Sequence, residues 1–327
     1  EDDAYITRIE QLQKEQERLQ YRRAKLKSKK MKRNNQNNLG VSTSPEEIVP
    51  DGVEDENSEF IRTDYGVEVL RRTWASLHEY QHAGCRWLHK LYDEGVGGIL
   101  GDEMGLGKTA QMCTHLGSLA LLHDENRQPA AVASVSAGRC MSSIFIVVCP
   151  ATVLHHWLQE FHHWAPFMRA VVLHGISATA AELLRVGNTG IPKVLRRLQR
   201  KPETKGLVVI TTYEGLRKYR QALVSVEWTA VCLDEGQKIR NPATEITATC
   251  KMLPAFHRVI LSGTPIQNSL RELWSLFDFI YPGRLGALPV FEQEFANPIR
   301  AGGYANANAL QYEIAIRCAS TLQKIVK

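Results

Sequence analysis

The sequence predicts an α/β three-layer domain built on a mostly parallel sheet. Short apolar runs rich in Val, Ile and Leu, such as SIFIVVC and GLVVIT, are typical of strands buried on both faces of such a sheet. Helical patterns alternate with these runs along the chain, and a glycine-rich loop follows the first run. Alternation of this kind favours parallel strands joined by helices.

Composition supports a globular protein. The chain has 327 residues, 44% of them hydrophobic and 23% charged, and a net charge of +5. This length allows one to three domains. Seven cysteines without a CxxC pair, two of them in apolar runs (Cys149 and Cys232), predict reduced core thiols rather than disulfides or a zinc site. No signal peptide and no apolar run near 18 residues is found, so we expect a soluble intracellular protein without a membrane segment.

The first residues predict a polar helix followed by a linker. Within residues 1–33, Leu12, Leu19 and Leu26 recur every seven residues, which fits a short coiled coil, a docking helix or a helix on the protein's own surface. The tract RRAKLKSKKMKR is either a nuclear-localisation or nucleic-acid-binding arm or a solvated basic face. Residues 34–60 are polar and predict a flexible linker.

The folded lobe is expected over residues 61–327, with a helical extension from about residue 283. A helical pattern follows Leu77 and ends before Ile99, and residues 124–142 form an insertion or long loop. Strands are predicted at 143–149, 170–173, 206–211, 229–233 and 258–261, and helices at 153–163, 178–186, 194–200, 244–251 and 270–279. The chain begins without Met and ends in a helical pattern, so we expect a fragment of a longer protein.

The stretch GILGDEMGLGKTAQ has the layout of a phosphate-binding loop between a strand and a helix. Gly105 and Gly107 let backbone N–H groups surround a polyphosphate at the helix N-terminus. Lys108 is placed to reach the β- and γ-phosphates, and the Thr109 hydroxyl to bind Mg²⁺. Asp102 replaces the first glycine of the usual pattern, and glycine-rich turns also occur for structural reasons alone.

An acidic pair, Asp234 and Glu235, ends the predicted strand TAVCL about 125 residues after this loop. Such a pair suits the second half of an NTPase site, in which Asp234 holds Mg²⁺ and Glu235 orients or deprotonates the attacking water. Gln237 and Lys238 follow in the same loop, where a polar side chain can sense the γ-phosphate.

Other strand ends carry candidate coupling and nucleic-acid residues. The string SGTPIQN, with Thr264 and Gln267, follows the next strand, where small hydroxyl residues can bridge the acidic pair to a second surface. Alone it would be an N-capping turn. Thr152 and Thr212 follow two further strands, where hydroxyls and helix N-termini are good phosphate ligands. For Trp157, packing against a residue four positions later is favoured over base stacking.

Four histidines lie near Trp157, at positions 155, 156, 162 and 163. No Cys or carboxylate accompanies them at a ligand spacing, so we interpret them as surface or packing residues rather than metal ligands.

Taken together, DEMGLGKT, CPATVLHHW, ITTYE, LDEGQ and LSGTPIQNSLRELWSLFDFIYPG resemble the first RecA-like lobe of Swi2/Snf2-type superfamily-2 ATPases. The strings LDEGQKIRNP, FDFIYPGRLGALPVFEQEF and PIRAGGYANA are most similar to the Cockayne syndrome group B subfamily. The resemblance implies a DNA-stimulated ATPase that translocates on double-stranded DNA. It further implies a nuclear role with stalled RNA polymerase II and repair factors in transcription-coupled repair, which no residue chemistry above establishes.

The resemblance also implies roles for single residues. Gln81 would contact the adenine, Lys108 and Thr109 would bind the phosphates and Mg²⁺, and Asp234 and Glu235 would form the Walker B pair.

For the DNA side of the motor, Thr264 and Gln267 would couple hydrolysis to DNA gripping. Thr152, Thr212 and Lys238 would lie along the tracked strand.

Two departures from the family pattern matter. The family usually has His where Gln237 stands, which leaves the coupling role of that position open. No second strand–helix series follows Pro282, so the second lobe and its arginine finger are missing, and we expect slow hydrolysis by this fragment. Two alternatives stay open: a non-hydrolysing scaffold or DNA-binding module, and a superfamily-2 helicase with another nucleic-acid substrate.

Overall fold

The computed structural model describes residues 58–123, 143–174, 187–199, 204–263, 269–305 and 307–326. The predicted N-terminal helix, nearly all of the predicted linker, the insertion at 124–142 and the predicted helix at 178–186 lie outside these residues. Among the helices it describes, none is long and apolar enough to cross a membrane.

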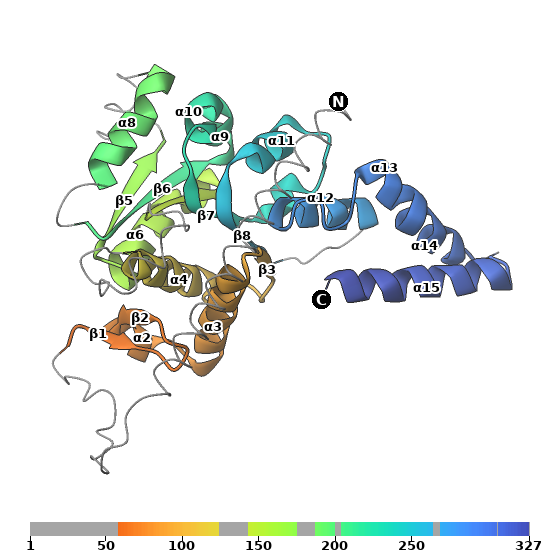
Figure 1. Ribbon diagram of the computed structural model, residues 1–327, viewed down its shortest axis with the longest axis horizontal. Helices are drawn as coiled ribbons and strands as arrows, with labels where there is room; N and C mark the ends of the chain where they lie inside the picture. Colours follow the sequence, from red (N-terminus) through yellow and green to blue (C-terminus); the bar gives the residue numbers. More distant parts are fainter. Residues whose placement is uncertain are drawn as a thin grey trace, which may run out of the picture.

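A six-stranded sheet forms the centre of the fold, and all of its described pairings are parallel (Figure 1). The strand order is β3-β8-β7-β4-β6-β5. The strands span β3 Gly98–Leu100, β4 Ile144–Cys149, β5 Met168–Leu173, β6 Gly206–Thr212, β7 Trp228–Asp234 and β8 Ala255–Leu261. Every residue of β4 and β6 is buried, as their continuous apolar sequences predict. The predicted mostly parallel α/β sheet is confirmed.

Helices cover both faces of the sheet and produce the three layers (Figure 1). One face packs against α3 Glu79–Glu94, α4 Lys108–Leu122 and α6 Leu154–Trp164, which bury side chains such as Leu88, Leu116 and Phe161. The other face packs against α8 Gly187–Gln199, α9 Tyr213–Lys218, α10 Arg220–Val224, α11 Glu245–Met252 and α12 Leu270–Ile280. The predicted helix at 194–200 is longer than expected, because α8 begins at Gly187.

A small antiparallel hairpin precedes the sheet. It consists of β1 Phe60–Arg62 and β2 Glu68–Leu70, followed by α2 Arg71–Ser76. Val69 and Leu70 are buried, and Phe60 packs edge-to-face against Phe167 with ring centroids 5.5 Å apart. Strands of three residues are too short for an alternating pattern to be visible, which is why the sequence did not indicate this hairpin.

The chain after α12 is helical and projects from one side of the body (Figure 1). It contains α13 Leu288–Phe291, a π-helical segment η3 Glu292–Ala296, α14 Asn297–Gly302 and α15 Ala309–Val326. These helices share a small core with α12, formed by Trp274, Phe291 and Leu322 among others.

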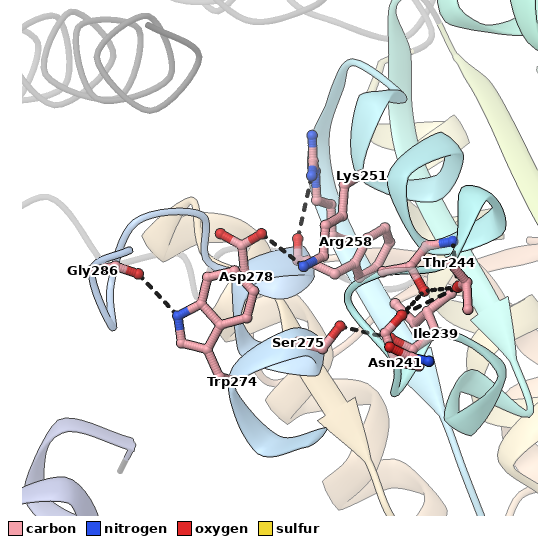
Figure 2. A network of polar contacts seen from close by, with 11 residues as sticks. Ile239, Asn241, Thr244, Lys251, Arg258, Trp274, Ser275, Asp278 and Gly286 are labelled. Atoms are coloured by element: carbon pink, nitrogen blue, oxygen red, sulfur yellow. Dashed lines mark hydrogen bonds and ion pairs between the residues drawn. The ribbon is translucent and has the colours of Figure 1, made fainter. Parts of the chain in front are cut away.

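A buried ion pair lies where α11 meets α12 (Figure 2). The Lys251 ammonium lies 2.8 Å from the Asp278 carboxylate, and both side chains are less than a tenth exposed. Lys251 also lies over the ring of Trp274, whose indole N–H donates to the carbonyl of Gly286 at 2.9 Å. These contacts attach the turn that begins the helical extension to the body of the lobe.

Candidate functional site

The site lies at the carboxyl edge of the sheet, where the three strands β3, β8 and β7 end side by side. Leu100 pairs with Leu261, and Leu261 pairs with Asp234. The backbone N–H of Ser262 then donates to the carbonyl of Leu100 at 3.2 Å. The parallel register therefore brings the phosphate loop, the acidic pair and Ser262 together from three distant parts of the sequence.

The phosphate loop turns at Gly105 and Gly107, whose φ angles are +88° and +70°. This left-handed region is open to glycine and costs other residues energy. A Cβ on Gly107 would also lie only 2.2 Å from Nε2 of Gln81. Both glycines are therefore required by the backbone path of the loop.

Lys108 and Thr109 are the first two residues of α4. The Lys108 ammonium donates to the carbonyl oxygens of Asp102 at 2.6 Å and Glu103 at 2.8 Å. The Asp102 carboxylate accepts a hydrogen bond of 3.4 Å from the side chain of Gln111, a residue of α4. The loop is thus closed on itself by side chains from the helix that it precedes.

Gln81 ties α3 to this loop. Its side-chain oxygen accepts from the backbone N–H of His78 at 2.9 Å, and its amide donates to the carbonyl of Leu106 at 3.3 Å. A pocket of about 620 Å³ lies beside the loop, lined by Tyr80, Gly84, Trp87, Ile99, Leu100, Gly101, Asp102 and Leu106. Aromatic and aliphatic side chains next to a phosphate loop suit a flat base.

Asp234 is held by three hydrogen bonds. Its carboxylate accepts from the indole N–H of Trp157 at 2.8 Å and from the backbone N–H of Glu235 at 3.0 Å. Its carbonyl accepts from the hydroxyl of Tyr213 at 2.7 Å. Burial raises the pKa of Asp234 above the usual carboxyl value, while the Trp157 hydrogen bond and the Lys108 charge oppose that rise. Asp234 is therefore fixed in position, and the Lys108 charge lies close enough to influence its pKa.

Glu235 has a φ of +52°, and it is the one residue other than glycine with a positive φ in the described part of the chain. Such a conformation costs of order 1 kcal/mol and is often found at functional sites. The Glu235 carboxylate accepts from the side-chain amide of Gln237 at 2.6 Å. The Gln237 oxygen in turn accepts from the hydroxyl of Ser262 at 3.2 Å. Ser262, which begins the SGTP string, is therefore connected to the acidic pair through Gln237.

The short helix η2 Gly236–Ile239 carries Gln237 and Lys238, and α12 holds its end in place (Figure 2). The hydroxyl of Ser275 donates to the carbonyl of Ile239 at 2.7 Å. Two residues later, the carbonyl of Asn241 accepts from the hydroxyl of Thr244 at 3.1 Å. The turn behind the acidic pair is therefore anchored on both sides.

Comparison with known proteins identifies the family. The model of the SNF2-related domain matches residues 80–327. The chain belongs to this family. The described fold accordingly has the RecA-like architecture of an SNF2 ATPase core, and the resemblance expected from the motifs is confirmed.

Individual SNF2 relatives are similar over most of the chain. The DNA repair and recombination protein RAD26 of Saccharomyces cerevisiae is 40% identical over 77% of this chain and 25% of its own length. The DNA excision repair protein ERCC-6 of Mus musculus is 41% identical over 84% of this chain and 17% of its own length. The chain thus spans a quarter or less of these relatives.

A solved structure of the family is also similar. The Sulfolobus solfataricus SWI2/SNF2 ATPase core in complex with double-stranded DNA is 30% identical, with a TM-score of 0.53. The match covers 76% of this chain and 42% of that one.

The SNF2 family implies ATP with Mg²⁺, and the residues of this chain fit both. Gly105 and Gly107 have no Cβ, so a phosphate could approach the loop backbone at these positions, whose positive φ values favour glycine. Thr109 and Asp234 offer the hard oxygen donors that Mg²⁺ prefers. Lys108 supplies a cation beside them.

The predicted nucleic-acid residues of this SNF2 chain differ in exposure. Thr152 and Lys238 are exposed, whereas Thr212 is buried and its hydroxyl accepts from the backbone N–H of Gly215 as the N-cap of α9. A DNA contact by the Thr212 hydroxyl stays a prediction. Thr264 and Gln267 lie outside the described residues.

Trp157 is fully buried, and its ring centroid lies 5.9 Å from that of Phe161. The expected packing is confirmed, and the ring is not free to stack on a base. The nearby histidines at 155, 156, 162 and 163 are exposed.

Sequence reasoning missed two residues of the site, Trp157 and Tyr213 as partners of Asp234. Each belongs to a helix that follows a strand on the far side of β7, at the same sheet edge. The strand order would have brought Trp157 near Asp234, because residues after neighbouring parallel strands converge and β4 is the neighbour of β7. Tyr213 follows β6, one strand further along.

Proposed function

We propose that this chain is the first RecA-like lobe of an ATP-driven motor that translocates on double-stranded DNA and acts in DNA repair. The supporting observation is the convergence of Lys108, Asp234 and Glu235 at one sheet edge, next to a loop with two left-handed glycines. A cation, two carboxylates and a glycine-rich helix N-terminus are the groups that phosphoryl transfer requires.

In this proposal the loop from Asp102 to Gly107 surrounds the phosphates of the nucleotide, and Lys108 binds the β- and γ-phosphates. Thr109 and Asp234 would hold Mg²⁺, which would neutralise phosphate charge when bound. Glu235 orients or deprotonates the attacking water.

Two glutamines complete the nucleotide site in this proposal. Gln237 fixes the Glu235 carboxylate, to which it donates a hydrogen bond of 2.6 Å. Gln81 recognises the adenine beside the aromatic pocket, because an amide can both donate to and accept from the edge of the base.

In this proposal Thr152, Thr212 and Lys238 contact the phosphate backbone of the DNA. Thr264 and Gln267 couple ATP hydrolysis to DNA movement. Exposure of Thr152 and Lys238 supports their part of this assignment. Hydroxyls and lysines that contact phosphates carry no base preference, which suits a motor that moves along any sequence.

The biological setting follows from the relatives. Two of them are named DNA repair or DNA excision repair proteins, and a solved relative is complexed with double-stranded DNA. We extend this to transcription-coupled repair in the nucleus, with RNA polymerase II and repair factors as partners and a chromatin-remodelling type of ATPase activity. A second RecA-like lobe would supply the arginine finger that completes the ATP site.

The test is ATP hydrolysis by the full-length protein with double-stranded DNA, single-stranded DNA, RNA or no nucleic acid. The proposal expects the largest stimulation by double-stranded DNA and its loss in Lys108→Ala with an unchanged fold. Wild-type rates in Lys108→Ala would overturn the site assignment. No hydrolysis under any condition would favour a scaffold, and greater stimulation by single strands or RNA would favour a helicase with another substrate.

A further inference from the structure

We propose that Trp157 is a positioning residue for Mg²⁺: its indole N–H holds the Asp234 carboxylate in the orientation in which that carboxylate binds the metal. The inference rests on the proposed function, because it takes Asp234 as the Mg²⁺ carboxylate. It adds a residue from a separate part of the sequence that the proposed mechanism does not use.

The fold determines where Trp157 lies. Strand β4 is the neighbour of β7 in the sheet, and the helix α6 begins shortly after β4 ends. Trp157 is in the first turn of α6, and its side chain is 0% exposed. Phe161, one turn later on the same helix, packs beside the indole ring. Because a buried indole packed in this way has few rotamers open to it, its N–H points in a fixed direction.

That direction leads to Asp234. The Trp157 Nε1 atom lies 2.8 Å from Oδ2, and the backbone N–H of Glu235 donates to Oδ1 at 3.0 Å. The Tyr213 hydroxyl fixes the backbone of the same residue by donating to its carbonyl at 2.7 Å. A carboxylate has about four lone-pair positions, so two donors still leave it able to bind a cation or a water molecule.

The chemistry of the indole suits this task. An indole N–H only donates, so it neither competes for the cation nor changes its role during the reaction. Partners that orient a metal ligand typically change metal affinity by about 10- to 100-fold when they are removed. Loss of the Trp157 N–H would free the carboxylate to rotate while leaving both of its oxygens in place.

A second tryptophan provides a matched control. Trp228 is 1% exposed, and its indole N–H donates to the backbone carbonyl of Leu223 at 2.9 Å. It begins β7, at the opposite end of the strand from Asp234. Replacing either tryptophan with Phe removes one buried hydrogen bond and part of one buried ring, but only one of the two replacements touches Asp234.

The experiment compares Trp157→Phe, Trp228→Phe and Asp234→Asn in the full-length protein. Electron paramagnetic resonance measures the binding of Mn²⁺ in the presence of ADP, independently of turnover. ATPase assays then give the Mg²⁺ concentration for half-maximal rate and kcat. We expect Trp157→Phe to weaken Mn²⁺ binding and raise the Mg²⁺ requirement about 10-fold. We expect Trp228→Phe to stay within about twofold of wild type in both measurements, because its lost hydrogen bond is remote from Asp234.

Two outcomes would overturn the proposal. Unchanged Mn²⁺ affinity in Trp157→Phe, with weakened binding in Asp234→Asn, would remove the positioning role alone. Unchanged binding in Asp234→Asn, or no ADP-dependent Mn²⁺ binding by the wild type, would overturn the site assignment and the positioning role with it. If Trp157→Phe does not fold, benzothienylalanine at position 157 keeps the ring shape and removes only the N–H. That variant should also bind Mn²⁺ more weakly, and unchanged Mn²⁺ affinity in it would overturn the positioning role.

Discussion

The carboxylate of Glu235 accepts a hydrogen bond of 2.6 Å from the side-chain amide of Gln237. The same glutamine accepts from Ser262, which follows the neighbouring strand β8. Gln237 therefore joins the proposed catalytic carboxylate to the strand end from which the proposed coupling residues follow. An amide does not titrate, so Gln237 itself adds no ionisation to this link.

Replacing Gln237 tests this link. Gln237→Leu removes both hydrogen bonds, and we expect kcat of the DNA-stimulated ATPase to fall about 10-fold, because Glu235 is no longer held. Gln237→His, the residue usual in the family, keeps a donor and should retain most activity. It should also introduce a new ionisation near neutral pH into the rate profile, because an imidazole titrates there. Wild-type kcat in the leucine variant would contradict the proposed role.

Glu235→Gln tests the base itself. The amide fills the same space but is a poor base, so we expect kcat to fall about 10²- to 10⁴-fold. Binding of a fluorescent ADP analogue should stay within about threefold of wild type, because the proposed nucleotide contacts lie on Lys108 and the loop. A variant that binds normally and also turns over normally would show that another group activates the water.

The glycine at position 107 has a specific expected role. Gly107→Ala places a Cβ at a φ of +70° and against Gln81, so we expect nucleotide affinity to fall at least about 10-fold, since even small displacements are costly. Gly66→Ala is the matched control, because Gly66 has a φ of +83° with only Arg62 nearby, at 4.0 Å. Both variants should lose about 1 kcal/mol of stability in urea unfolding. Equal nucleotide affinity in the two variants would show that the loop tolerates the change.

The buried ion pair predicts a specific pattern of stability. Lys251→Ala leaves the Asp278 carboxylate buried without its cation and should cost about 3 to 5 kcal/mol of unfolding free energy in urea titrations. The double variant Lys251→Met/Asp278→Leu should be more stable than the single variant, because no charge is then left unpaired. Arg317→Ala breaks the exposed pair with Glu313 and should change stability by less than about 1 kcal/mol. A double variant less stable than Lys251→Ala would contradict this reasoning.

Two buried histidines, His115 on α4 and His257 on β8, predict that the free energy of unfolding depends on pH. Burial lowers the pKa of His257 from 6.5 to about 4 and lowers that of His115 well below 6.5. Their rings lie 5.3 Å apart between α4 and β8. Below pH 6.5 the unfolded chain binds protons that the folded chain does not, so stability falls as pH falls from 6.5 towards 4.

The measurement is urea unfolding at pH 7.5 and pH 5.5, above the range in which ordinary carboxylates titrate. Each of the two buried histidines should contribute about 1 kcal/mol of lost stability over this interval. His115→Phe should lose part of this dependence, whereas the exposed His155→Gln should keep all of it. A pH-independent unfolding free energy would mean that these rings are already charged or hydrated in the folded state.

Much of the fold could be predicted because its signals are local. The runs at β4, β6 and β7 are apolar and β-branched, and the loop before Lys108 has the glycine spacing that its backbone requires. The β1–β2 hairpin could not be predicted, because it depends on packing between short segments rather than on a repeating pattern. The start of α8 was missed because Gly187 and Pro192 weaken its helical signal.

A residue's place in the candidate site was predictable where its own strand end or loop sets that place, as for Asp234 and Gly107. It was not predictable where the role depends on which strands are neighbours. Trp157 is separated from Asp234 by 77 positions in the sequence, and only the order β7-β4 brings them together. Thr212 has a role that the sequence did not indicate: its hydroxyl caps the helix that follows its strand.

The place of β3 in the sheet has a consequence for synthesis on the ribosome. Among the described strands, β3 lies at the edge and pairs only with β8, whose residues are made about 160 positions later. The phosphate loop therefore emerges early but gains its supporting strand only after residues 255–261 have been translated. A nascent chain halted before residue 255 should therefore carry a phosphate loop whose strand β3 lacks the β8 pairing.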